Sequence, residues 1–217
     1  MDIIIEHIKQ VLPFYIIFEI FYYGSKYIIP DFNTIYFLLH FIVNLINTFL
    51  LLPLIYNIIQ DPTGKYILLE NWDKLDIIYP MIIGLHTFHI VHSISKINYD
   101  EIIHHLITHI FWYFIIYTDN PFYIAPIIAM SGIPGGITYF LLFLQKYNLI
   151  ERKTEKKISM YLNLWLRAPL CIILASLLYI QGTQNDIFYE TLFMVLFTMI
   201  NGIHFMHNII KSYYITK

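Results

Sequence analysis

The chain has 217 residues, of which 58% are hydrophobic, 18% aromatic and only 13% charged. A soluble domain carries about twice that charged fraction, so the composition argues against a soluble globular protein. The formal net charge of −2 leaves no basic footprint for a nucleic acid partner, and a single cysteine, Cys171, excludes an internal disulfide.

Long apolar segments follow one another along the chain, separated by short breaks that are mostly marked by Pro, Gly, Asn or Asp. Each segment is about long enough to cross a hydrocarbon core as a helix. The segments are continuously apolar rather than alternating, which favours helices over strands. We therefore predict an all-α polytopic membrane helix bundle with about seven transmembrane helices, forming one domain over residues 1–217. The predicted spans are 8–29, 34–59, 76–94, 101–118, 121–145, 157–180 and 187–210.

The basic residues divide unequally between the two ends of these predicted spans. One end collects only Lys9, Lys65 and Lys74. The other end collects Lys26, Lys96, Lys146, Arg152, Lys153, Lys156, Lys157, Lys211 and Lys217. Because positive residues stay on the cytoplasmic side, we predict a lumenal N-terminus and a cytoplasmic C-terminus.

Three histidines stand at a spacing of three in the span 76–94: His86, His89 and His92. This spacing places them along one helix face. Polar side chains at membrane depth are costly and usually face the bundle interior or a wet cavity. We expect the three to line a cavity and bind substrate, and a purely structural role is equally open.

The pair His104-His105 opens the span 101–118, and two acids precede it. Asp100 lies four residues before His104, and Glu101 lies four residues before His105, so each carboxylate is one helical turn from an imidazole. A carboxylate in that position fixes the tautomer of a histidine and raises its basicity, as a general base requires. These four residues are the predicted catalytic group.

Further polar residues lie in or beside other predicted spans. Arg167 is an intramembrane cation that needs an anionic or carbonyl partner. We predict that Thr108, Arg167, Asn201 and His204 contact substrate. The remaining polar side chains, which include His40, Asn44, Asn47 and Asn163, are expected to form interhelical hydrogen bonds.

The segment 99–108, with acids ahead of His104-His105 and a threonine three residues after the pair, resembles the signature of the TLC-domain family. That family includes the ceramide synthases. The segment 165–169, which contains Arg167, resembles the arginine-bearing penultimate span of the family, and 199–204, which contains Asn201, resembles its last span.

The resemblance implies a helix bundle around a lipid-sized cavity in the endoplasmic reticulum, with membrane lipid as the partner. It also implies that His104 and His105 serve acyl transfer to a lipid amine, with acyl-CoA as co-substrate and no bound cofactor or metal. The stretch 128–138 departs from the synthases because it contains no acid, and its Gly-Pro-Gly content indicates a broken or kinked helix. The resemblance therefore favours lipid metabolism, lipid binding or membrane lipid homeostasis in general over ceramide synthesis.

The sequence leaves two alternative functions open. The histidine groups at 86–92, 104–109 and 204–207 also suit a di-iron membrane hydroxylase or desaturase, since imidazole is a good ligand for iron. A receptor-like seven-span protein fits the predicted topology. A transporter is also open, because membrane histidines can relay protons. A retinal protein is disfavoured, because Lys211 lies at the end of the last span.

Overall fold

A computed structural model describes residues 2–29, 31–62, 72–94, 99–118, 120–185 and 187–216. For residues 2–4, 72–76, 100, 101, 103, 113, 116–118 and 121 within these ranges, the description covers the backbone alone. The catalytic prediction for the side chains of Asp100 and Glu101 therefore lies outside the described part of the chain.

Most of the described residues are helical, and none of them forms a strand. The long helices are α1 (Asp2–Ser25), α2 (Phe32–Gln60), α3 (Trp72–Ser93), α4 (Tyr99–Thr118), α5 (Ile133–Lys146), α6 (Arg152–Leu162), α7 (Ala168–Gln184) and α8 (Phe188–Thr216). Three short helices complete the set: the 3-10 helix η2 (Pro121–Ile124) and the π-helical turns η3 (Ile128–Gly132) and η4 (Asn163–Arg167). The all-α prediction is confirmed.

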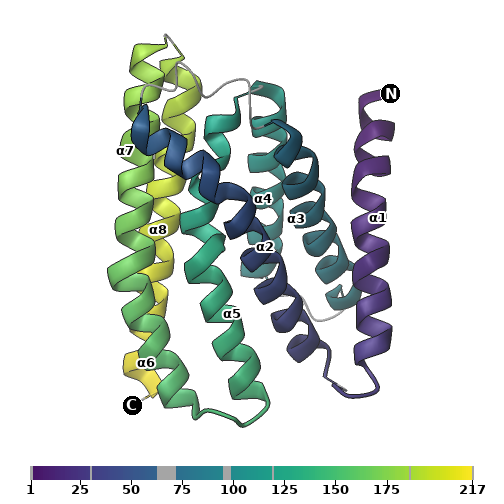
Figure 1. Ribbon diagram of the computed structural model, residues 1–217. Coiled ribbons are helices and arrows are strands. Elements are labelled where there is room, and N and C mark those ends of the chain that lie inside the picture. Colours follow the sequence, from purple (N-terminus) through teal and green to yellow (C-terminus); the bar gives the residue numbers. More distant parts are fainter. Residues whose placement is uncertain are drawn as a thin grey trace.

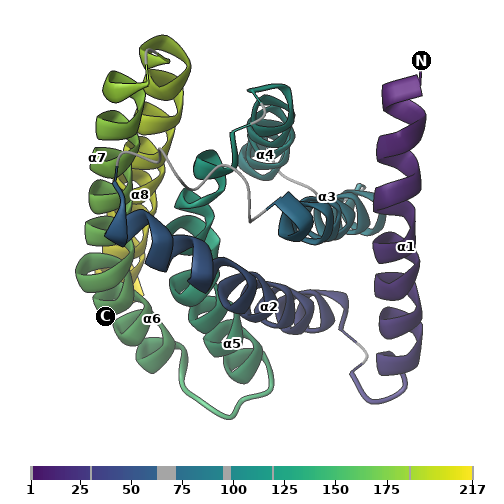
Figure 2. The ribbon, with the colours of Figure 1, turned by 45° about the horizontal axis from the view of Figure 1, so that its top comes forward.

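The helices form a bundle in which α7 and α8 stand side by side at one edge and α1 stands at the opposite edge (Figures 1 and 2). Between them lie α2, α3, α4 and α5. The N-terminus and the C-terminus lie at opposite ends of the bundle, and the connections after α1 and α5 lie at the end of the C-terminus (Figure 1). This arrangement puts Lys146 and Arg152, the basic helix ends that flank the connection between α5 and α6, at the same end as the C-terminus.

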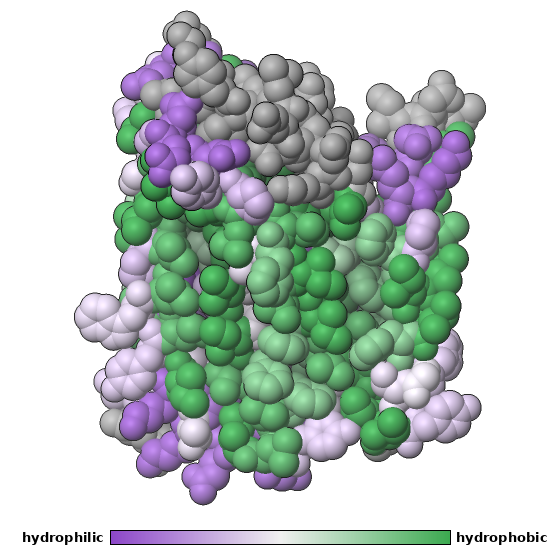
Figure 3. Space-filling model, in the orientation of Figure 1, coloured by the Kyte–Doolittle hydropathy of each residue, from purple (hydrophilic) through white to green (hydrophobic). Residues whose placement is uncertain are grey.

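Among the residues that the structure describes, four helical stretches are long and apolar enough to cross a membrane: Phe32–Gln60, Phe122–Lys146, Arg152–Gln184 and Phe188–Thr216. Figure 3 shows a broad hydrophobic belt between two hydrophilic ends of the molecule. Large apolar side chains in this belt face outward, among them Ile20, Phe49 and Ile200. Exposure of such an apolar surface to water is unfavourable, whereas contact with the hydrocarbon core of a membrane is favourable. The protein is thus suited to an integral membrane position, and the count of seven spans stays a prediction.

Small residues allow close helix contacts in this bundle. A Cβ atom added at Gly202 of α8 would lie 2.8 Å from the Cβ of Cys171 on α7, and one added at Gly182 of α7 would clash with Thr191 of α8. Close backbone approach at small residues drives helix association in membranes, where apolar burial gives little. Helices α7 and α8 therefore pack closely against each other, which holds their side chains at defined positions relative to one another.

The structure differs from the predicted spans at one helix boundary and bears out the irregularity predicted in 128–138. The polar stretch 146–157 was read as a break between spans, yet helix α6 already begins at Arg152 and continues through η4 into α7. Lys, Glu and Arg are good helix formers, so charge marks the end of the apolar belt and not the end of the helix. The irregularity expected in 128–138 is present as the π-helical turn η3, which directly precedes Pro134 at the start of α5.

Candidate functional site

Three buried histidines from α3 and α4 meet in the bundle interior. The three-residue spacing of His86 and His89 places both on the face of α3 that meets α4, where His105 inserts between them. The Nδ1 atom of His105 lies 2.7 Å from Nδ1 of His86, and its Nε2 atom lies 2.8 Å from Nδ1 of His89. All three side chains are buried. We refer to His86, His105 and His89 as the histidine chain.

The hydrogen bonds of the histidine chain run in one direction from donor to acceptor. A neutral imidazole carries one N–H donor and one acceptor nitrogen, and each short N···N contact needs one of each. Because His105 uses both of its nitrogens, it donates to one neighbour and accepts from the other. Shifting the protons along both hydrogen bonds reverses this direction and moves a proton from one end of the chain to the other. The arrangement can therefore take up a proton at one end and release it at the other.

Aromatic rings from α2 and α5 surround this chain. The ring of Tyr36 stacks on His89 with centroids 3.9 Å apart, and Tyr36 also hydrogen-bonds His40 through its hydroxyl group. His40 lies edge-on to His86, and Tyr139 stacks on the other side of His40 at 4.1 Å. This aromatic enclosure keeps polarity low around the chain, which strengthens its hydrogen bonds.

The two members of the predicted catalytic pair occupy different environments. His105 is 2% exposed and lies within the histidine chain, whereas His104 is exposed. The ring of His104 still lies near the chain, with its centroid 5.4 Å from that of His86 and 5.5 Å from that of His105. The ring of Phe205 on α8 also lies near it, at a centroid distance of 6.4 Å. Of the two, His104 is the histidine that a ligand can reach.

Arg167 also lies against Phe205, the residue whose ring centroid is 6.4 Å from that of His104. Its guanidinium carbon is 3.9 Å from the centroid of the Phe205 ring, a cation–π contact. Its Nη2 atom donates to the backbone oxygen of Met130 and, at 3.4 Å, to Oδ1 of Asn201. Met130 belongs to η3 and Arg167 to η4, so the guanidinium joins the two π-helical turns. The structure thus brings Arg167 and Asn201 together beside the ring that His104 faces.

Three other residues expected to bind substrate make different contacts. His92 pairs with Glu19 of α1, its Nε2 atom 3.0 Å from Oε1. The hydroxyl group of Thr108 donates to the backbone oxygen of His104 in its own helix. His204 is exposed and lies 2.9 Å from Nδ2 of Asn208, one turn further along α8. None of these contacts links the three residues to the histidine chain.

Sequence reasoning missed several residues that shape this region. Tyr36, Tyr139 and Phe205 were not singled out, because an aromatic residue in an apolar span has no distinctive pattern. His40 was expected to be a structural hydrogen-bonding residue, yet it lies directly beside His86. His40 lies four residues before Asn44, which places both on one buried face of α2. This spacing could have indicated that His40 faces the bundle interior.

The geometry also bears on the metal-enzyme alternative. Within the described ranges, no group of three or more His, Cys, Asp or Glu side chains is arranged to hold a metal ion. The nitrogens of the histidine chain point at one another at hydrogen-bonding distance. His207 and His204 are exposed on α8. The three histidine groups therefore do not combine into one ligand set.

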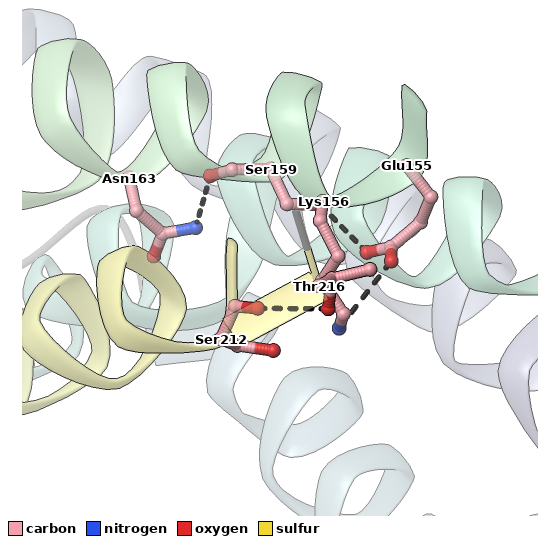
Figure 4. A network of polar contacts seen from close by, with 6 residues as sticks. All are labelled: Glu155, Lys156, Ser159, Asn163, Ser212 and Thr216. Atoms are coloured by element: carbon pink, nitrogen blue, oxygen red, sulfur yellow. Dashed lines mark hydrogen bonds and ion pairs between the residues drawn. The ribbon is translucent and has the colours of Figure 1, made fainter. Parts of the chain in front are cut away.

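A second buried polar group lies on α6 and η4 (Figure 4). The hydroxyl group of Ser159 donates to Oε1 of Glu155 at 3.0 Å, and Nδ2 of Asn163 donates to the backbone oxygen of Ser159 at 2.8 Å. Lys156 pairs with Glu155 at 3.3 Å. We call Glu155, Ser159 and Asn163 the polar row. It faces the end of α8, where Ser212 and Thr216 lie, and the two hydrogen bonds given above stay within one helical run.

Comparison with known proteins adds no identification to this geometry. No protein-family model, no curated protein and no solved structure matches the chain. The resemblance of residues 99–108 to the TLC-domain signature accordingly enters only as support for a proposal.

Proposed function

We propose that this protein is a seven-span membrane protein of TLC-domain type that binds or modifies membrane lipids. The observation that carries the proposal is the exposed His104 beside the buried histidine chain. An accessible imidazole next to a proton-relaying chain is a general acid–base arrangement. The motif in residues 99–108 supports the same class of protein.

The setting of His104 favours a ligand that dissolves in the membrane. On α4, Ile102, Leu106 and Ile107 are exposed large apolar residues around it. On α8, Ile200 and Ile203 are also exposed. A water-soluble molecule would lose its hydration beside such surfaces, whereas a lipid would not. The ligand that meets His104 is therefore a lipid.

The reaction that we propose is acyl transfer from acyl-CoA to a lipid amine. The amine nitrogen attacks the thioester carbonyl carbon, a C–N bond forms and the C–S bond breaks. His104 removes the proton that the amine loses and returns a proton to the departing thiolate, so that CoA leaves as a thiol. No metal or bound cofactor takes part in this scheme.

Lipid analysis of cells tests this function. The wild-type protein, His104→Gln and the control His207→Gln would be expressed at equal levels, and the total lipids compared by mass spectrometry. His207 is an exposed histidine of α8. We expect wild type and His207→Gln to shift at least one lipid class and His104→Gln to lose the shift. Coinciding profiles for wild type and His104→Gln would reject a role of His104 in lipid chemistry.

The proposal includes a location in the endoplasmic reticulum with a lumenal N-terminus and a cytoplasmic C-terminus. Support comes from the basic residues, which gather at the connections after α1 and α5 and near the C-terminus. Protease protection of tags on both termini in sealed microsomes checks the topology. Tags on the same side would contradict seven spans.

Proton transport is a second candidate, favoured by the histidine chain itself. Its two N···N contacts connect α3 and α4 in a form that can pass a proton. Purified protein in liposomes with an internal pH dye separates the two functions. Dissipation of a pH gradient by wild type but not by His105→Gln, without any lipid change in cells, would favour transport.

A further inference from the structure

Arg167 is a buried cation with no acidic partner among the side chains that the structure describes. Its side chain is 7% exposed. The ion pairs present in the described part of the chain are Lys9–Glu6, His92–Glu19 and Lys156–Glu155. Glu155 stands in the same helical run, twelve residues earlier, which places it about 18 Å away along the helix axis. A charge in hydrocarbon surroundings requires closer compensation than this.

The contacts that Arg167 does make are with neutral groups. They are the backbone oxygen of Met130, the amide oxygen of Asn201 and the ring of Phe205. Both hydrogen bonds start from Nη2, and the Nε atom is buried without a partner. A guanidinium group has five N–H donors in a planar fork. The group therefore keeps donor capacity that a two-oxygen anion can fill.

The position of Arg167 connects this donor capacity to the proposed lipid site. Both groups lie close to Phe205: the guanidinium carbon of Arg167 is 3.9 Å from the centroid of its ring, and the centroid of the His104 ring is 6.4 Å from the same point. Phe205 and Asn201 are both half-buried, and α8 is the candidate span least covered by the rest of the protein. The exposed His104 and the buried Arg167 are thus both near Phe205, so that one lipid molecule beside α8 can reach both groups.

We propose that Arg167 anchors an oxyanion of the lipid ligand, either a carboxylate or a phosphate group. The identification of the ligand as a lipid rests on the proposed function, and the inference adds that this lipid is anionic. A guanidinium binds carboxylate and phosphate oxygens through two parallel hydrogen bonds, which a lysine cannot reproduce. The anion also supplies the missing counter-charge in the apolar belt.

Binding measurements on the purified protein test this proposal. The protein would be placed in nanodiscs of phosphatidylcholine, and the affinities for oleate, oleyl phosphate and the neutral oleyl alcohol compared. We expect at least one of the two anionic probes to bind about tenfold more tightly than the alcohol, because its oxygens form charge-assisted hydrogen bonds with the guanidinium group. Equal affinity for all three probes overturns the proposal without any variant.

Variants locate the effect at Arg167. Arg167→Gln should abolish the preference for the anionic probes, while Lys211→Gln, which removes an exposed cation near the end of α8, should retain it. If Arg167→Gln does not fold, Arg167→Lys serves instead, and it should weaken the preference by losing the two-point contact. A folded Arg167→Gln or Arg167→Lys protein with the wild-type preference contradicts the assignment.

Two further readouts separate the sources of the anion and the two proposals. Inorganic phosphate at millimolar concentration should not displace oleate or oleyl phosphate; displacement would show a site for a water-soluble anion and overturn the lipid assignment. The lipid profile of cells responds to His104→Gln, and the anion preference responds to Arg167→Gln. If the wild-type protein changes no lipid class in cells but still prefers the anionic probes, the proposed function is wrong and the anion site is retained.

Discussion

The histidine chain and the polar row have similar spacing in the sequence but different contacts in the fold. His86 and His89 are three residues apart, and Glu155 and Ser159 are four apart, so each set follows one helix face. The histidines of α3 hydrogen-bond to a residue of α4, whereas Ser159 and Asn163 bond to groups in their own helical run. Helical spacing therefore predicts which side chains share a helix face, but it does not predict whether their hydrogen-bond partners lie in the same helix or in a neighbouring one.

This difference assigns different roles to the two groups. A polar side chain whose hydrogen bond closes within its own helix is satisfied before the bundle assembles. A histidine that bonds across helices depends on the packing of α3 against α4. Changes in the histidine chain should therefore disturb packing and function together, and changes in the polar row should disturb stability alone.

The largest effect is expected from His105→Leu. This change leaves the facing nitrogens of both His86 and His89 without their partner, and two unsatisfied buried groups cost about 2–4 kcal/mol. We expect a fall of this size in the free energy of unfolding, together with loss of the lipid shift. Unfolding in detergent micelles by titration with a denaturing detergent measures the first quantity.

The matched control for this change is His109→Leu in the same helix. His109 makes one hydrogen bond, to the backbone oxygen of His105, and is half-buried. Its replacement should cost about 1 kcal/mol or less. Equal losses for the two variants would show that His105 has no special position between two histidines.

A smaller effect is expected in the polar row from Glu155→Ala. The carboxylate is 1% exposed and accepts from Ser159, so its removal leaves a buried hydroxyl group unpaired and should cost about 1–2 kcal/mol. Glu155→Gln keeps an acceptor oxygen and should lose less. Both variants should retain the wild-type lipid profile. A changed profile at normal stability would mean that the polar row belongs to the functional site after all.

The smallest effect is expected from Thr108→Val. The Thr108 hydroxyl group bonds to the His104 backbone oxygen one turn earlier, and exchange for an isosteric apolar residue should change the free energy of unfolding by about 0.5 kcal/mol or less. The same variant checks the sequence-based prediction that Thr108 binds substrate. A weaker lipid shift at unchanged stability would support that prediction.

Much of the fold was readable from hydropathy, because an apolar segment of sufficient length has few alternatives to a helix in a membrane. The helix ends were less readable. Helix α8 runs to Thr216, beyond the predicted end at 210, since its last polar turns are still compatible with helix. The π-helical form of Ile128–Gly132 was not predictable in detail, although Gly132 and Pro134 indicated an irregularity.

The candidate site was readable only in part. Spacing placed His86 and His89 on one face, but the meeting of that face with His105 depends on how α3 and α4 rotate and pack. The split between His104 and His105 had a simple physical signal, because adjacent residues of a helix point about 100° apart and cannot both face one cavity. The partners Glu19 and Phe205 come from distant helices, and no local pattern announces them.

The π-helical turn Asn163–Arg167 has a consequence for changes in chain length. A π turn holds one more residue than the α-helical turn that it replaces, so everything beyond it is rotated by about 100° relative to an uninterrupted helix. That rotation sets which side of α7 meets α8, including the close contact of Cys171 with Gly202. Deleting one residue from this turn would therefore re-aim the whole of α7, whereas deleting one residue from the connection before α6 would only shorten a surface loop.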